Sequence, residues 1–491
     1  MAGLAVATAA AAQDLGEPHL TPVSRTPDEA ALVATLTAIT PKPSAAEAMP
    51  GGAATVPVRR DDEAFSAPSG NLPPERLADF RAGKALFAKL WIAAPSALVN
   101  SDGLGPLYNA RSCQACHVRD GRGHAPTEAD GGVTTMVLRL SIPALAETGA
   151  LADYLTTEPD PVYGSQLQDF GTDGHPAEYR LKVTWDSYAV PLSGGETATL
   201  RRPTFHAADL GYGPLHPDAM FSPRVAQQLI GLGLLEAIPA ADILALADPE
   251  DADGDGISGR PNVVWSAEFD QPMLGRFGHK ALVPTIREQS AAALAADMGI
   301  ATPLFPAPAG DCTVAQADCR AAPHGGDPAG AELAAVGLDL LTFYSRNLGV
   351  PARRDPDAAD VLRGREVFHQ TGCTACHQPG FVTHRLADQP ERSFQLIWPY
   401  TDLLLHDMGP GLADHRPEGG ASGSEWRTAP LWGIGLTATV SGKAGFLHDG
   451  RAQSLLEAIL WHGGEAEASR DRVVALPPAD RAALIRFVES L

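Results

Sequence analysis

The chain has 491 residues, with 59 acidic against 37 basic side chains and a formal net charge of −22. So acidic a chain argues against nucleic-acid binding, which requires a basic face, and it contains no run of about 18 apolar residues that could span a membrane. Its length allows two or three domains, and its 49 glycines and 42 prolines predict long ordered loops between modest helices.

The N-terminal residues divide into two segments. Residues 1–12 are similar to the second half of a secretory signal, because a short apolar run ends in three small residues. The positively charged front part of such a signal is missing, and a disordered Ala-rich terminus is the alternative. Residues 13–72 are rich in Ala, Pro, Thr and Asp. We expect an N-terminal extension that wraps on the surface or is partly disordered.

The segment SCQACH carries the first chemical motif. Two cysteines separated by two residues and followed by histidine form the attachment pattern of a c-type haem. The thiols of Cys113 and Cys116 would add to the haem vinyl groups, and the imidazole of His117 would bind the iron. For a single copy, a zinc half-site or a redox dithiol is the alternative.

A second copy favours haem over these alternatives. In GCTACH, residues Cys373, Cys376 and His377 repeat the pattern 260 residues further on. We therefore predict two covalently bound haem c groups.

Each motif lies between an opening and a closing helix. Gly-x-x-x-Phe occurs ahead of both motifs, in GKALF and in GREVF, and apolar helical stripes follow in residues 331–349 and 478–491. An opening helix, a haem motif and a closing helix predict a cytochrome c-like domain. We expect a mainly α protein with long loops and two such haem domains: residues 73–352, carrying a large insertion, and residues 353–491.

Two further motifs lie in the insertion. In DADGDGISGRPN, alternating Asp251, Asp253 and Asp255 have the oxygen-rich spacing of a calcium loop, although Asn262 replaces the final glutamate of an EF-hand. An acidic, solvent-exposed turn is the alternative. Cys312 and Cys319 are seven residues apart in a loop-like segment and predict a local disulfide. Together with the haem motifs and the signal-like start, this pair indicates a periplasmic protein.

Longer stretches resemble a known family. SPRVAQQLIGLGLLEAIPAADILALADPEDADGDGISGRPN, GRFGHKA, YTDLLLHDMGPGLAD and GFLHDGRAQSLLEAILWHGGEA are similar to the di-haem oxidoreductase branch of the bacterial di-haem cytochrome c peroxidase superfamily, also labelled thiol oxidoreductase-like. The resemblance covers about residues 73–491. It implies a peroxide-reducing haem in the N-terminal half and an electron-receiving haem in the C-terminal half.

The resemblance also implies an iron ligand for the C-terminal haem. The matching position in FLHDGRAQSLLEAILWHGG is His462, where peroxidase members of the superfamily place Met or Tyr. Imidazole donates more strongly to ferric iron than thioether, so His462 would lower the reduction potential. Met408 is the rival ligand, and His406 and Met408 could instead line the pocket.

For the N-terminal haem, the resemblance implies an acid/base pair. In TIREQSAAALAADMG, the matching residues are Gln289 and Asp297, eight residues apart, with Asp in place of the usual Glu. Cleavage of the peroxide O–O bond needs a proton moved between the two oxygens, which a carboxylate can perform.

The position of an inter-haem tryptophan in the superfamily is occupied here by His279. Histidine does not readily hold a radical cation, so Trp265 is a substitute candidate. His279 could instead approach a haem propionate or an iron, and Lys280 could pair with a propionate.

These expectations combine into one function. We expect a periplasmic enzyme of peroxidase type that takes electrons at the C-terminal haem and reduces hydrogen peroxide or another small oxidant at the N-terminal haem. A small cytochrome or a cupredoxin would be the electron donor. The alternatives are an electron-transfer protein without catalysis and oxidative modification of a partner protein.

Overall fold

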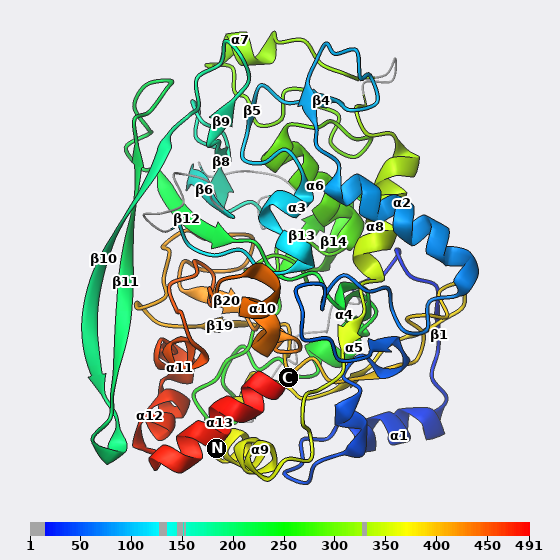
Figure 1. The fold of residues 1–491 in the computed structure, drawn as a ribbon, viewed down its shortest axis with the longest axis vertical. Helices are drawn as coiled ribbons and strands as arrows, with labels where there is room; N and C mark the ends of the chain where they lie inside the picture. The colour runs from blue at the N-terminus through cyan, green and yellow to red at the C-terminus, as the bar shows by residue number, and fades with distance from the viewer. Residues whose placement is uncertain (1–14, 127–134, 145–150, 152–153, 327–330) are drawn as a thin grey trace, which may run out of the picture.

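The computed structural model describes residues 15–126, 135–144, 151, 154–326 and 331–491. The signal-like segment 1–12 lies outside these residues. Figure 1 shows the helices of residues 77–88, 286–298 and 335–346 in the upper part of the view. Those of residues 359–370 and 455–490 lie in the lower part, together with the helix of residues 27–37. Within the described residues, no helix is long and apolar enough to cross a membrane.

The expectation of a mainly α protein built from two cytochrome c-like domains is wrong. The chain is 30% helical and 19% strand, and the strands form many small sheets. Most long strands lie in the insertion between the first haem motif and its closing helix. The largest sheet there orders β12 (Met220–Val225), β6 (Met136–Pro143) and β7 (Thr157–Glu158), and β8 (Gln166–Leu167) also pairs with β6.

The longest strands form an exposed hairpin. β10 (Arg180–Pro191) pairs antiparallel with β11 (Thr197–Ala208) along its whole length. On β10, partly buried Leu181, Val183 and Trp185 alternate with exposed neighbours, which is the two-residue period of a strand. The sequence of β10 shows this alternation, but the prediction of a mainly α fold rested on the helical stripes near the haem motifs.

The hairpin also joins the two halves of the chain. It lies along the left edge of Figure 1, and its tip reaches α12 (Glu467–Ala475) and α13 (Pro478–Ser490). Leu192 and Leu200 belong to the same hydrophobic core as the C-terminal helices. The insertion therefore contributes to the packing of the half that carries the second haem motif.

What the sequence predicted correctly is the helix pair around each motif. In the N-terminal half, α2 (Leu77–Ala88) packs on α8 (Ala335–Arg346), and in the C-terminal half α9 (Ala359–Gln370) packs on α13. Glycine permits both close approaches: a Cβ at Gly83 would collide with the carbonyl oxygen of Leu340, and one at Gly364 with that of Ala483.

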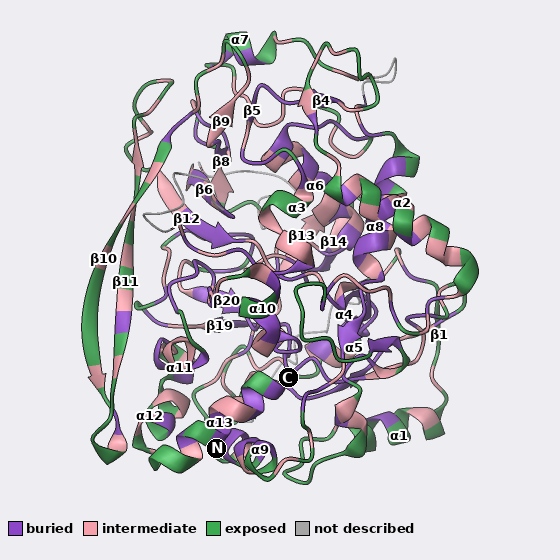
Figure 2. Ribbon diagram, in the orientation of Figure 1, coloured by how far each residue is buried: buried purple, intermediate pink, exposed green. Residues whose placement is uncertain are grey.

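The N-terminal extension is ordered where it is described. It contains α1 (Pro27–Thr37), and it buries Phe65 completely. Figure 2 shows buried segments running through the lower and central parts of the molecule. The extension therefore contributes to the core as well as covering the surface.

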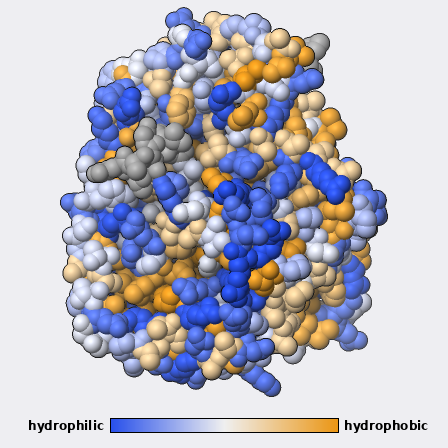
Figure 3. Space-filling model, viewed as in Figure 1, coloured by the Kyte–Doolittle hydropathy of each residue, from blue (hydrophilic) through white to orange (hydrophobic). Residues whose placement is uncertain are grey.

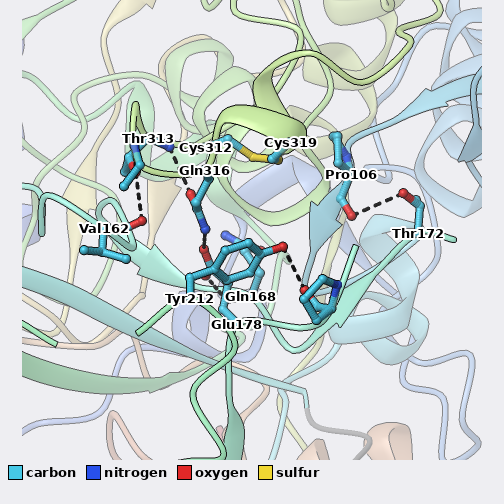
Figure 4. The surroundings of a disulfide bond; sticks show 12 residues. Pro106, Val162, Gln168, Thr172, Glu178, Tyr212, Cys312, Thr313, Gln316 and Cys319 are labelled. Atoms are coloured by element: carbon cyan, nitrogen blue, oxygen red, sulfur yellow. Dashed lines mark hydrogen bonds between the residues drawn. A yellow bond between two sulfur atoms is a disulfide. The ribbon is translucent and has the colours of Figure 1, made fainter. Parts of the chain in front are cut away.

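The predicted disulfide between Cys312 and Cys319 is confirmed. The loop that it closes places Gln316 over Glu178, as Figure 4 shows, and the Gln316 amide donates a hydrogen bond to that carboxylate. Burial raises the pKa of Glu178 to about 8. Glu178 also accepts a hydrogen bond from the backbone N–H of Gln168 at 2.7 Å. The Gln168 side chain in turn donates to the carbonyl oxygen of Ala296 in α6 (Ile286–Met298), so Glu178 connects the disulfide loop to a segment that contacts this helix.

Candidate functional site

Both haem motifs form short helical turns after their opening helices. Cys113–Cys116 forms α3, and Cys373–Ala375 forms a turn of 3-10 helix. The four cysteines are free thiols and partly exposed. The structure therefore leaves both thiol pairs available for a covalent bond.

The two motif histidines are oriented in the same way. The Nδ1–H of His117 donates to the carbonyl oxygen of Gln227 at 2.6 Å, and that of His377 donates to the carbonyl oxygen of Tyr400 at 2.9 Å. This bond selects the tautomer in which Nε2 is free to bind a metal. Burial lowers the pKa of both imidazoles, that of His377 to about 4, which keeps them in the neutral form that ligates iron.

A large apolar cavity lies beside the second motif. Its wall contains His377 and, from the segment after α11 (Leu455–Leu460), His462. The Nδ1–H of His462 donates to the carbonyl oxygen of Ala458 at 2.8 Å, so its Nε2 is also free. On the face in Figure 3, apolar surface gathers at the lower left, where Figure 1 places α11. The structure brings two neutral imidazoles to the wall of one cavity, and His462 as an iron ligand stays a prediction.

Two buried arginines complete the fit of this cavity to haem. Arg122 donates to the carbonyl oxygens of Gly445 and Leu447, and Arg427 donates to that of Gly278. Burial lowers the pKa of each guanidinium to about 10, so both remain cationic at neutral pH. Within the described ranges, neither forms an ion pair with a carboxylate. The Asp402 charge also acts on Arg427. Buried cations that form no ion pair suit the propionates of a haem whose vinyl groups meet the thiols.

His406 is not free to bind iron. Its Nε2 lies 2.8 Å from Asp402 Oδ2, and its Nδ1 lies 2.7 Å from Glu465 Oε2. Burial opposes the imidazolium, but hydrogen bonds to Asp402, Cys376 and Glu465 outweigh it and raise the pKa of His406 to about 12. Met408 lines the cavity and keeps its place as the rival ligand.

Asp297 is a half-buried residue of the N-terminal half, at the C-terminal end of α6. Its carboxylate accepts a hydrogen bond from Gln166 Nε2 at 2.7 Å, and its carbonyl oxygen accepts one from Asn109 N–H, just before the first motif. Burial raises the pKa of Asp297. Burial and then the Asp297 charge raise the pKa of Cys113 to about 12. The Asp297 carbonyl oxygen also accepts the N–H of Ala110, three residues before Cys113.

Gln289 lies on the same helix, eight residues before Asp297. That spacing corresponds to about 12 Å along the helix axis. Gln289 Oε1 instead faces Gly278, next to His279. The structure does not bring Gln289 and Asp297 together, and their joint role stays a prediction.

His279 contacts an aromatic group that the sequence did not indicate. Its ring is nearly perpendicular to Trp426, with centroids 6.3 Å apart, and Trp426 stacks on His448 at 3.8 Å. His279, Trp426 and His448 all line the cavity. Trp265, the predicted substitute for the superfamily tryptophan, contacts Tyr154 instead. No local pattern around Trp426 distinguishes it from a core tryptophan.

Lys280 is not available for a propionate. It is fully buried, and its Nζ donates to Asp414 and to the carbonyl oxygens of Arg416 and Ser422, at 2.7 to 2.8 Å. Burial lowers the pKa of Lys280 to about 8, against the attraction of Asp414. All three ammonium protons are therefore used within the protein.

In the acidic loop, the carboxylates that converge are those of Asp248, Asp251 and Asp253, with oxygens within 4.8 Å of one another. Asp255 is not in this group, and its carboxylate accepts the Ile257 N–H instead. Asn262 is buried elsewhere, where its amide donates to the carbonyl oxygen of Lys280. Calcium at Asp251, Asp253 and Asp255 stays a prediction.

Residues 45–491 match the family model described as "Di-haem oxidoreductase, putative peroxidase". The match covers nearly the whole chain, so the chain belongs to this family, as its motifs predicted. A search of curated proteins found no match.

Proposed function

We propose that this member of the di-haem oxidoreductase family is a periplasmic enzyme of peroxidase type. In this proposal, haem c is attached covalently at Cys113 and Cys116 and at Cys373 and Cys376. Electrons from a small cytochrome or a cupredoxin enter at the C-terminal site. Hydrogen peroxide or another small oxidant is reduced at the N-terminal site.

One observation carries this proposal: Gln227 touches both haem sites. Its carbonyl oxygen accepts the hydrogen bond from His117, the ligand of the N-terminal site. Its side chain lines the C-terminal cavity and lies 3.0 Å from His279 Nδ1. The two sites are thus joined by one residue and a few hydrogen bonds, an arrangement suited to passing electrons from one to the other.

The haem groups would supply iron that exchanges electrons with the donor and the oxidant. The chain supplies the proton. Asp297 is half-buried and has a raised pKa, so it can take a proton from one peroxide oxygen and return it to the leaving oxygen. Gln166 holds the carboxylate in place through its hydrogen bond to Oδ1.

Two features of the chain support the location. Both haem motifs are complete, and Cys312 and Cys319 form a disulfide, which persists in oxidising compartments. The net charge of −22 suits a basic electron donor, because opposite charge speeds encounter at low ionic strength.

A steady-state assay tests this function. The haem-loaded protein, mixed with a reduced cytochrome c or cupredoxin, should oxidise the donor only when peroxide is added. Two moles of one-electron donor should be consumed per mole of peroxide. Fast exchange of electrons with the donor and no consumption of peroxide would contradict the proposal and favour an electron-transfer protein.

A further inference from the structure

A glutamate of the N-terminal extension bonds to a residue that supports the C-terminal haem site. Glu47 is 1% exposed and lies in a short 3-10 turn, Ala45–Ala48. In Figure 1 this dark-blue part of the chain runs beside α9 at the lower edge of the molecule. Arg365 of α9 donates to Glu47 at 2.8 Å and also to the carbonyl oxygens of Thr40 and Pro41.

Glu47 holds the hydroxyl of Tyr400. Tyr400 Oη–H donates to Glu47 Oε2 at 2.9 Å, and Arg353 donates to the same oxygen at 3.0 Å. The Tyr400 ring is fully buried between Phe368 and Phe487, each with its centroid 5.8 Å away. Both ends of the tyrosine side chain are therefore fixed by their surroundings.

The backbone of Tyr400 is strained, and it carries the group that orients His377. Tyr400 has φ +54°, in the left-handed region that residues with a Cβ avoid. In this conformation its carbonyl oxygen accepts the Nδ1–H of His377 at 2.9 Å. A strained residue persists only where its surroundings hold it, and here the hydroxyl bond to Glu47 is part of what holds it.

We propose that Glu47 is a positioning residue for the C-terminal haem, acting through Tyr400 on His377. The inference rests on haem attachment at Cys373 and Cys376. A hydrogen bond to Nδ1–H increases the electron donation of the imidazole and stabilises ferric iron. The N-terminal extension thereby lowers the reduction potential of the haem at which electrons enter, and of that haem alone.

Tyr400→Phe is the central test, because it removes only the hydroxyl and changes no formal charge. The midpoint potentials of both haems are measured by spectroelectrochemical titration, with electron paramagnetic resonance of the ferric protein. We expect the C-terminal haem to shift to a higher potential and the N-terminal haem to stay unchanged. Glu47→Gln should shift the same haem in the same direction.

Two comparisons separate positioning from general stability. Glu17→Gln is the matched control: Glu17 is also an extension glutamate, bonded to Arg276 and His384, away from Tyr400. It should leave both potentials unchanged. In the double variant with Glu47→Gln and Tyr400→Phe, the shift should be smaller than the sum of the two single shifts, because both changes act on the hydrogen bond between Tyr400 and Glu47.

Two outcomes would overturn the inference. An unchanged C-terminal potential in Tyr400→Phe, or equal shifts of both haems, would show that Glu47 only stabilises the fold. Tyr400→Phe keeps the Glu47 ion pairs, so it decides the question even if Glu47→Gln does not fold. Mass analysis of the peptide that contains Cys373 and Cys376 tests the premise that the inference shares with the proposed function. A haem-free peptide in the unaltered protein would overturn both, whereas unchanged potentials in a haem-loaded protein would overturn the inference alone.

Discussion

Around Cys113 and around Cys373 the chain builds the same local frame. Ahead of each motif a helix approaches its partner through a glycine, and a phenylalanine from that helix lies against the motif histidine. The ring centroids are 6.1 Å apart for Phe87 and His117, and 6.2 Å apart for Phe368 and His377. A backbone carbonyl accepts the Nδ1–H in both.

The two sites differ in what else surrounds the histidine. The C-terminal cavity presents a second imidazole with a free Nε2, that of His462, whereas the N-terminal site has the half-buried Asp297, whose backbone bonds to the residues just before Cys113. The closing helices of the two halves differ as well. Tyr344 on α8 donates a hydrogen bond to Asp120 at 2.6 Å, whereas Phe487, the matching residue on α13, has no hydroxyl. One frame can therefore hold two haems with different tasks, because the frame sets attachment and the surroundings set chemistry.

The largest expected effect is the loss of the haem from one of the two sites. Cys373→Ala with Cys376→Ala should remove one covalent haem, and Cys113→Ala with Cys116→Ala should remove the other. The reason is that each thiol pair forms the bonds to its own haem. Mass spectrometry after acid–acetone extraction checks this. A single haem in the unaltered protein would show that the two motifs are not equivalent attachment sites.

The next change sharpens the difference at the C-terminal site. His462→Ala should abolish a low-spin signal of a bis-histidine haem in electron paramagnetic resonance and raise the reduction potential of that haem, because the stronger donor is lost. Met408→Ala is the control from the same cavity wall. Survival of the signal in His462→Ala, with its loss in Met408→Ala, would assign the ligand to Met408.

Asp297→Asn should slow peroxide reduction by about 10²–10⁴-fold, the usual contribution of an acid/base group. Gln289→Ala, on the same helix, should do less, because an amide orients without moving a proton. Stopped-flow mixing of the half-reduced protein with peroxide measures both. Rates like those of the unaltered protein in Asp297→Asn would remove the carboxylate from the mechanism.

The pH dependence follows from the raised pKa of Asp297. The base form is the deprotonated one, so the rate should fall as the pH drops through that raised pKa, and Asp297→Asn should lose this fall. A raised pKa in the folded state also means that the ionised carboxylate costs stability at neutral pH. The Asn variant should therefore fold at least as well as the unaltered protein.

Smaller effects are expected when the shared frame itself is disturbed. Gly83→Ala and Gly364→Ala each place a Cβ against a carbonyl oxygen of the facing helix. Each should cost about 1–3 kcal/mol of unfolding free energy, the usual range for overpacking. Urea titration followed at each haem would measure it. Gly411→Ala is a control for the loss of a glycine, because a Cβ there would meet only the Trp461 ring, at an ordinary contact distance of 3.6 Å.

The parts that the sequence predicted are those encoded by neighbouring residues. Haem attachment needs Cys-x-x-Cys-His in one run, and a helix that passes close to another needs glycine on its contact face, so both motifs and both helix pairs could be recognised. The alternation of β10 also predicts the β-hairpin, but the helical stripes near the haem motifs do not justify a mainly α fold for the whole chain.

Other parts could not be predicted, because they depend on segments distant in the sequence. Glu47 is more than 330 residues from Tyr400, which it bonds, and Gln227 is 110 residues from His117. Trp426 is more than 20 residues from His448, on which it stacks. Nothing in the sequence around these three residues indicates a function. Lys280 shows the converse: a basic residue beside a promising motif is bonded to a carboxylate and two carbonyl oxygens.

The central claim is that one haem transfers electrons and the other reduces peroxide. Its most direct test measures the spin state of each haem together with its reactivity in the unaltered protein. Absorption and magnetic circular dichroism spectra, which report ferric and ferrous haem alike, are recorded for the half-reduced, haem-loaded protein before and after one equivalent of peroxide. We predict a low-spin C-terminal haem that keeps its ligands and an N-terminal haem with a high-spin, five-coordinate fraction that disappears on mixing. Two six-coordinate, low-spin haems and no consumption of peroxide would contradict the account.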